Sequence, residues 1–218
     1  MKWKARTPPI AIGGGLATES LLERPKNKPS FVSTNNLLTF VAMNKKLKLW
    51  ELDRVSEEAF KVQKKFPLIL VLDDIRSLNN VGSFFRTADA FNVEKIYLCG
   101  ITACPPHREI QKTALGATES IEWEHVTDIT QLIQQLKAEN TTICSIEQTE
   151  KTTFLQDCNT LPGDRFALIF GNEVNGVNQA AINASDVVLE IPQFGTKHSL
   201  NVSVCAGVVL WEFAKKYI

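Results

Sequence analysis

The stretch "IPQFGTKHSLNVSV", from Ile191 to Val204, carries the strongest evidence on the fold of this chain. Its first residues are typical of the end of a buried strand, and its last residues of the start of a buried helix. Between them lie turn-forming and hydrogen-bonding residues, namely Pro192, Gly195, Lys197, Ser199 and Asn201. Ligands of open parallel sheets bind at the carboxyl ends of the strands. A polar loop between two core elements therefore predicts a functional site at this point.

Strands and helices alternate along the chain before this loop. Continuous apolar runs such as "FPLILVLDD" indicate strands that are buried on both faces. The predicted strands are 66–74, 95–100, 120–126, 141–148, 166–171 and 186–192. The predicted helices are 80–91, a short one in 108–117, 128–139, 178–185, and a last one from about Ser199 to Lys216. The pattern predicts an α/β fold with a mostly parallel sheet flanked by helices.

The first part of the chain differs from the rest. Residues 1–42 are rich in Pro, Gly and Ser and are expected to form a flexible extension, with Met43 as a possible natural start. Residues 43–66 are basic, and a short amphipathic helix is predicted within 47–65. Its apolar side is expected to carry Leu49, Leu52, Val55 and Ala59. The main domain is predicted to span residues 67–218.

Composition excludes several classes of protein. A hydrophobic fraction of 44% argues against disorder over most of the length. The chain has no apolar run of about 18 residues and no signal peptide at its start, so we expect a cytoplasmic protein without a membrane span. Its five cysteines are odd in number and widely spaced, which indicates reduced thiols. Cys104 and His107 have no second ligand pair, so we expect no metal site.

Net charge is zero, but it is unevenly distributed. Residues 1–66 are basic, whereas 67–218 hold eleven Lys and Arg against eighteen Asp and Glu. This distribution permits a nucleic-acid partner without requiring one. The segment 43–66, together with Arg76, Arg108 and Lys112, is a candidate surface for an RNA backbone.

Two further strand ends carry polar clusters, "DDIRSLNNVGSFFR" (73–86) and "GNEVNG" (171–176). One such cluster would be an ordinary turn. Together with the 191–204 loop they favour a shared site. Common nucleotide motifs are excluded, because Val177 follows "GNEVNG" where a P-loop needs lysine, and no strand is followed by Gly-x-Gly-x-x-Gly.

These three segments resemble the three motifs of the SpoU (TrmH-type) RNA ribose 2'-O-methyltransferases of the SPOUT superfamily. Asn80-x-Gly82-x-x-x-Arg86 is similar to motif one, "FGNEVNGV" (170–177) to motif two, and "IPQFGTKHSLNVSVCAGVVLW" (191–211) to motif three. "QKTALGA" (111–117) also matches a recurrent family segment. The motifs occur in family order over 67–218. Leu78 departs from the proline of many members.

The resemblance implies a C-terminal trefoil knot, S-adenosylmethionine (S-adenosyl-L-methionine) as cofactor, and a homodimer whose site is completed across the interface. It assigns cofactor contacts to Gly171, Ile191 and Leu200. For Ile191 and Leu200, core packing is the alternative interpretation. It assigns the catalytic site to Arg86, Asn80, Glu173, Ser199 and Asn201. The last predicted helix of the chain is apolar nearly all round, which suits burial and a dimer contact.

Each of these residues has more than one possible role. Arginine is a poor general base because its guanidinium stays protonated at neutral pH, so we favour a phosphate clamp for Arg86. Asn80 and Glu173 are expected to fix loop geometry or to orient Arg86. Ser199 is also a good N-cap for the last helix.

The implied substrate is RNA. Transfer RNA is favoured over ribosomal RNA, because the chain lacks the separate substrate-binding domain of some ribosomal members. The alternatives are a ribosomal RNA methyltransferase, a non-catalytic RNA-binding member of the fold, and a small-molecule transferase unrelated to RNA.

Overall fold

The computed structural model describes residues 46–48, 51–52, 55–161 and 164–218. The chain divides into two units, 1–54 and 55–218, and the second contains the sheet. The predictions for residues 1–42 and for Met43 as a start lie outside the described residues.

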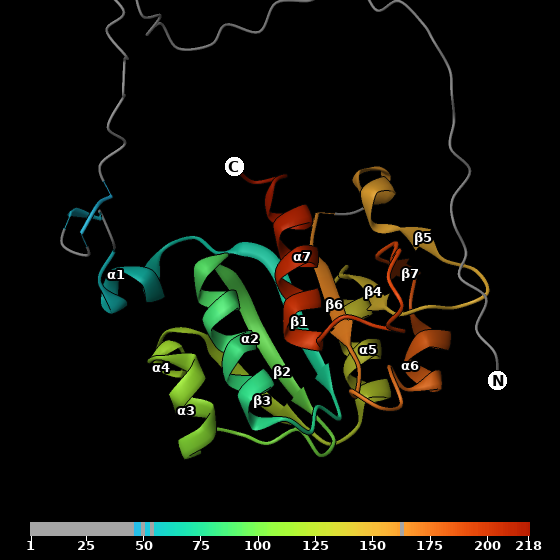
Figure 1. Cartoon of the computed structure of the whole chain (residues 1–218), viewed down its shortest axis with the longest axis horizontal. Coiled ribbons are helices and arrows are strands. Elements are labelled where there is room, and N and C mark those ends of the chain that lie inside the picture. The colour runs from blue at the N-terminus through green and yellow to red at the C-terminus, as the bar shows by residue number, and fades with distance from the viewer. Residues whose placement is uncertain (1–45, 49–50, 53–54, 162–163) are drawn as a thin grey trace, which may run out of the picture. The chain divides into compact units, whose positions relative to one another are not determined.

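A seven-stranded sheet forms the centre of the second unit (Figure 1). The strands are β1 Phe66–Asp73, β2 Val93–Cys99, β3 Glu122–Val126, β4 Thr142–Ile146, β5 Thr153–Phe154, β6 Phe166–Phe170 and β7 Val187–Glu190. Their order is β3-β2-β1-β6-β4-β7-β5, and every strand pair is parallel. The predicted α/β class with a mostly parallel sheet is confirmed, and the knot stays a prediction. β5 was not predicted, because two residues are too few for a periodic pattern.

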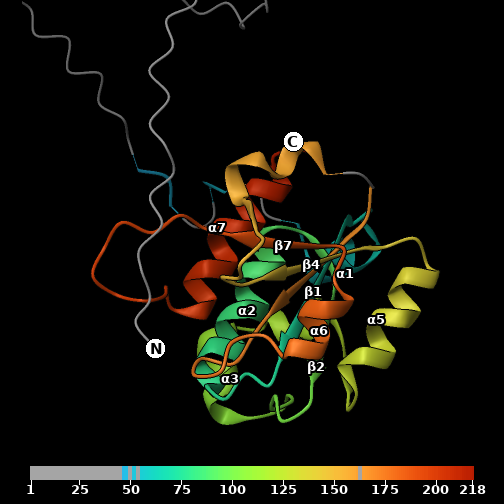
Figure 2. The same ribbon diagram turned by 90° about the vertical axis from the view of Figure 1, so that its right-hand side faces the viewer.

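Helices cover both faces of the sheet. They are α1 Glu57–Val62, α2 Leu78–Ala90, α3 Arg108–Ala114, α4 Ala117–Ser120, α5 Ile129–Ala138, α6 Gln179–Ala184 and α7 Val202–Ala214, with a 3-10 helix at Leu155–Thr160. Figure 2 shows α2, α3 and α7 on one side of the sheet and α5 and α6 on the other. None of the helices in the described ranges is long and apolar enough to cross a membrane.

The alternating side chains of β1 supply both halves of the core. Leu70 and Leu72 belong to one buried cluster, which contains residues of α2 and α7. Ile69 and Val71 belong to a second cluster, which contains residues of α5 and α6. Each side chain is fully buried, which stabilises the fold by about 1.5–3 kcal/mol per residue.

The predicted helix within 47–65 is shorter than expected, and two residues of its predicted apolar side are exposed; of the other two, Leu52 is partly buried and Leu49 lies outside the described residues. Helix α1 starts after Ser56, whose side chain accepts a hydrogen bond from the Ala59 amide. Ala59 is exposed, as is Val55, whereas Phe60 is buried in the core. A single large aromatic side chain gains more from burial than the predicted stripe of smaller residues.

The last helix begins at Val202, not at about Ser199. Asn201 is its N-cap, because its side-chain oxygen accepts hydrogen bonds from the amides of Ser203 (2.9 Å) and Val204 (3.3 Å). The predicted capping role of Ser199 is therefore wrong.

The chain reverses its direction of winding between β1 and β6, which are neighbours in the sheet. β1 is followed by α2 on one face, and β6 is followed by α6 on the other (Figure 2). The carboxyl ends of two such strands form the topological switch point where open α/β sheets bind ligands.

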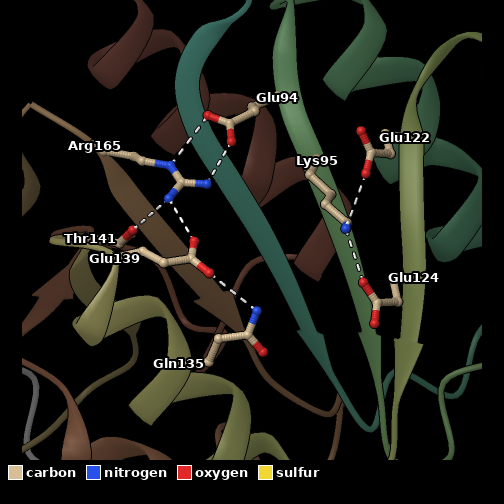
Figure 3. Close-up of polar contacts among 8 residues, drawn as sticks. All are labelled: Glu94, Lys95, Glu122, Glu124, Gln135, Glu139, Thr141 and Arg165. Atoms are coloured by element: carbon tan, nitrogen blue, oxygen red, sulfur yellow. Dashed lines mark hydrogen bonds and ion pairs between the residues drawn. The ribbon is translucent and has the colours of Figure 1, made fainter.

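Arg165 links three segments at the amino ends of the strands, opposite the switch point. Its guanidinium donates to Glu94 (Nη2–Oε1 2.6 Å), to Glu139 (Nη1–Oε2 2.9 Å) and to Thr141 (Nη1–Oγ1 3.2 Å), as Figure 3 shows. Arg165 precedes β6 and Glu94 lies in β2, so the contact passes over the start of β1. This half-buried cluster holds the amino ends of the strands in place.

We expect Arg165→Met to lower the free energy of unfolding by about 1–2 kcal/mol, since the two carboxylates would lose a shared cation and its hydrogen bonds. Thermal unfolding measures this as a fall in Tm of a few degrees. Lys112→Met is the control, because the exposed Lys112–Glu109 pair is 3.8 Å long and contributes little. Equal Tm changes in the two variants would contradict the proposed role of Arg165.

Candidate active site

The segment after β1 is held in place before helix α2 begins. Asp74 has a left-handed backbone with φ of 55°, and its Oδ1 accepts from the Ile101 amide at 2.9 Å. The buried Thr102 hydroxyl donates to the Leu72 carbonyl and accepts from the Ile75 amide, both at 2.9 Å. Ser77 then caps α2 by accepting from the Asn80 amide at 3.3 Å. The start of α2 is thus fixed at the carboxyl edge of the sheet.

The loop after β6 is a tight turn organised by Asn172. Asn172 and Gly176 exchange two backbone hydrogen bonds of 3.0 and 2.9 Å. The Asn172 side chain accepts from the amides of Val174 and Asn175 and donates to the Asp74 carbonyl at 2.7 Å. A Cβ at Gly171 would collide with the backbone of Gly176 and Val177. The turn itself therefore explains the glycine at position 171.

Glu173 joins this turn to the start of α2. Its carboxylate accepts from the amides of Arg76 (3.0 Å) and Ser77 (3.1 Å) and from the Asn80 side chain (3.0 Å). Burial tends to raise the pKa of Glu173, but the hydrogen bonds from Arg76, Asn80 and Ser77 outweigh it and lower the pKa. Glu173 therefore acts as an anion at a helix N-terminus, where the helix dipole favours negative charge.

Asn80 extends the network to the start of α7. Its Oδ1 accepts from the Asn201 side chain at 3.2 Å and lies 3.5 Å from the Ser203 hydroxyl. Ser203 also donates to Asn201 Oδ1 at 2.7 Å. Glu173, Asn80 and Asn201 thus form one hydrogen-bonded chain through all three sequence motifs. The sequence analysis did not name Ser203. Its position two residues after Asn201, where the side chain of a helix N-cap forms hydrogen bonds, could have pointed to it.

Two predicted catalytic residues lie outside this network. Arg86 is exposed on α2, and in the part of the chain that the structure describes no group forms a hydrogen bond or ion pair with its guanidinium. Ser199 is exposed in the 191–201 loop. Both side chains are free to meet a substrate or a second subunit.

The predicted cofactor residues lie around the same strand ends. Gly171 is buried directly after β6, Ile191 packs against the core directly after β7, and Leu200 is 39% exposed. Residues 193–200 make no backbone–backbone hydrogen bond within the described ranges. The His198 carbonyl accepts from the Gln148 side chain at 3.3 Å. The other amides and carbonyls of this segment lie next to apolar side chains and suit the edges of a purine and a ribose, which fits the predicted cofactor.

A cavity of about 440 Å³ lies at the ends of β1 and β6. It is lined by Asp73, Asp74, Asn172, Asn175, Gly176, Val177, Asn178 and Gln179. Burial raises the pKa of Asp73, and the charge of Asp74 adds to this, against a hydrogen bond from the Asn178 amide. Gly171, Ile191 and Leu200 are not among the lining residues, so this cavity is separate from the predicted cofactor contacts.

Thiol and metal chemistry find no support among the described residues. All five cysteines are free, and burial raises the pKa of Cys99 and of Cys205 to about 12, so these two stay protonated at neutral pH. Within the ranges that the structure covers, no group of three or more His, Cys, Asp or Glu is arranged to hold a metal ion.

Fold and site together define a parallel α/β protein with polar loops converging at the switch point, a class that includes many transferases. A family model described as the SpoU rRNA Methylase family matches residues 67–211. The chain therefore belongs to this family, and the recognition made from its three motifs is confirmed.

Similar proteins agree with this assignment. A 23S rRNA (guanosine-2'-O-)-methyltransferase of Neisseria meningitidis is 34% identical over 152 residues, which are 70% of this chain and 60% of that protein. The chain thus spans about 60% of the length of this relative. A TrmH/SpoU tRNA modifying enzyme of A. aeolicus has a TM-score of 0.65 at 23% identity, covering 73% of this chain and 79% of that one.

The SpoU methyltransferase AviRb of Streptomyces viridochromogenes, solved in complex with the cofactor AdoMet, has a TM-score of 0.62 at 19% identity. The match covers 75% of this chain and 63% of that one. At these identities the two structures support the fold. The cofactor named for AviRb agrees with the S-adenosylmethionine predicted here.

Proposed function

We propose that this chain is an S-adenosylmethionine-dependent methyltransferase that acts on a ribose 2'-hydroxyl of RNA. The observation that carries the proposal is the hydrogen-bonded chain Glu173–Asn80–Asn201, which joins the three family motifs at the switch point. Arg86 lies on the same helix as Asn80 and is exposed. Family membership supports the same reaction class.

When bound, S-adenosylmethionine supplies an electrophilic methyl group on a sulfonium sulfur. The protein's task is alignment, because positioning alone contributes about 7–11 kcal/mol in favourable cases. Glu173, Asn80 and Asn201 fix the loops around the reacting groups. Arg86 grips a phosphate beside the target ribose and offsets charge developing on the 2'-oxygen.

We name ribosomal RNA as the first substrate class. The Neisseria relative is called a 23S rRNA (guanosine-2'-O-)-methyltransferase, and this favours the alternative of the sequence analysis over its preference for tRNA. Transfer RNA is the second candidate, since the A. aeolicus enzyme of the same fold is described as tRNA modifying.

The chain is further proposed to act as a homodimer. Val204, Val208 and Trp211 of α7 are 55%, 41% and 53% exposed, which is unusual for the large apolar residues of a core helix. A second copy would cover this face. Size-exclusion chromatography with light scattering tests it, and a monomer at micromolar concentration would argue against it.

Methylation assays test the activity. Purified protein is incubated with methyl-labelled S-adenosylmethionine and with transcribed 23S rRNA or a transcribed tRNA pool, and nucleosides are identified by mass spectrometry. We expect 2'-O-methylated nucleosides, chiefly from the 23S transcript. RNA affinity should fall steeply between low and moderate salt. Label that appears only in bases, or in neither RNA, would refute the proposal.

A further inference from the structure

Leu115 has an unusual backbone conformation for its residue type. Within the described ranges, the non-glycine residues with positive φ are Asp74, Asn92, Leu115 and Asn140. Asp and Asn tolerate the left-handed region because their short polar side chains bond locally. A leucine has no such compensation, and its φ of 50° costs about 1–2 kcal/mol.

The surroundings of Leu115 hold it in this conformation without burying it. Its amide donates to the Gln111 carbonyl at 3.1 Å, and the Thr118 hydroxyl donates to the Gln111 side chain, also at 3.1 Å. The Leu115 side chain is 66% exposed. Leu115 is thus the left-handed C-cap that ends α3, a position where glycine or asparagine is usual, and as a leucine it gains little burial there. Strained residues of this kind concentrate at functional sites.

The packing of α2 against α3 and α4 places Arg86 along the same surface. Asn79 accepts from the Thr113 hydroxyl at 3.0 Å, and Ser120 donates to Asp89 further along α2. Gly82 lies directly against α3, where an added Cβ would collide with Thr113 and Ile110.

Residues 82, 86 and 89 share one face of α2, because i, i+4 and i+7 coincide on a helix. Position 86 therefore lies on the face of α2 that packs against α3 and α4, and Leu115 lies between these two helices.

Charge pairing distinguishes this surface from the opposite edge of the sheet. There Lys95 contacts Glu122 and Glu124, and Arg165 contacts Glu94 and Glu139 (Figure 3). On α2, Arg86 has no carboxylate partner among the described residues. An unpaired guanidinium and an exposed apolar side chain on the same surface complement a phosphate and the sugar or base attached to it.

We propose that Leu115 and Arg86 together hold one unpaired nucleotide of the RNA, with Arg86 on its phosphate and Leu115 against its base or ribose. The proposal rests on the proposed function and adds Leu115 as a positioning residue for the substrate. Apolar contact with an unstacked base adds affinity with little dependence on salt, unlike the contact with phosphate.

The test compares Leu115→Gly with Asn140→Gly. Both remove a side chain at a left-handed position, where glycine relieves backbone strain, and Asn140 lies at the end of α5. Binding of a fluorescein-labelled 12-nucleotide single-stranded RNA is measured by anisotropy, and KM and kcat are measured on transcribed 23S rRNA. We expect Leu115→Gly to keep or raise Tm, to weaken RNA binding about three- to tenfold, and to raise KM with kcat nearly unchanged.

Asn140→Gly should leave RNA binding unchanged. Leu115→Met keeps an apolar side chain and should bind RNA about as well as the wild type. The proposal is overturned if Leu115→Gly binds the probe like the wild type, if the wild type does not bind it at low salt, or if the variant shifts the molecular mass from dimer to monomer. The last result would assign Leu115 to a protein interface. Absence of methylation by the wild type, with the predicted binding pattern intact, would refute the proposed function alone.

Discussion

Arg86→Lys is expected to lower the rate of methyl transfer about 100-fold or more while leaving the fold intact. Lysine keeps the positive charge but loses the planar fork that binds two oxygens at once. The Arg86 guanidinium has no hydrogen bond or ion pair with the described residues, so its replacement breaks none of these interactions. The single-turnover rate on RNA, Tm and the Kd for S-adenosylmethionine separate these effects.

Arg108→Lys provides the matched control for this prediction. Arg108 is exposed at the start of α3, and it lies outside the hydrogen-bonded network. We expect no more than a small change in RNA affinity and a normal single-turnover rate. A near-normal rate in Arg86→Lys would show that charge alone suffices and that the two-oxygen grip is wrong.

The strands were predictable because their burial is encoded locally. "FPLILVLDD" has an apolar residue at nearly every position of β1, and a strand buried on both faces requires this pattern. Helix starts were less predictable. Ser199 and Asn201 are both good N-caps two residues apart, and only the folded position of α7 selects Asn201. Likewise, only tertiary packing selects Phe60 as the buried residue of α1.

The site was predictable as a set of motifs but not as a geometry. The resemblance to the three family motifs pointed to Glu173, Asn80 and Asn201 as candidates, whereas their hydrogen bonds join positions 93 and 121 residues apart. No local pattern encodes which side chains meet over such separations. The left-handed backbone of Leu115 could not be predicted either, because sequence periodicity carries no information on such a conformation.

Glu173→Gln is expected to lower turnover about 10-fold or more and to destabilise the fold by about 1 kcal/mol. The carboxylate accepts from two backbone amides and from Asn80, whereas a glutamine has one acceptor oxygen and presents an NH2 group to the remaining donors. Asn80 would lose its fixed position, and with it the contact to Asn201. Glu57→Gln, in the exposed first turn of α1, is the control for neutralising a carboxylate at a helix start; it should leave turnover unchanged.

The pH dependence of Tm separates this role from a merely steric one. The pKa of Glu173 is lowered in the folded state, so the folded protein binds the proton less tightly than the unfolded chain, whose glutamates titrate near about 4.3. The stabilisation is therefore fully present above that pH and is lost as the pH falls through the folded pKa. The Tm difference between wild type and Glu173→Gln should be largest at pH 6–8 and should shrink only as the pH falls through the lowered pKa of folded Glu173, below which both side chains are neutral. A difference that stays constant over this range would mean that the negative charge of Glu173 does not hold the start of α2.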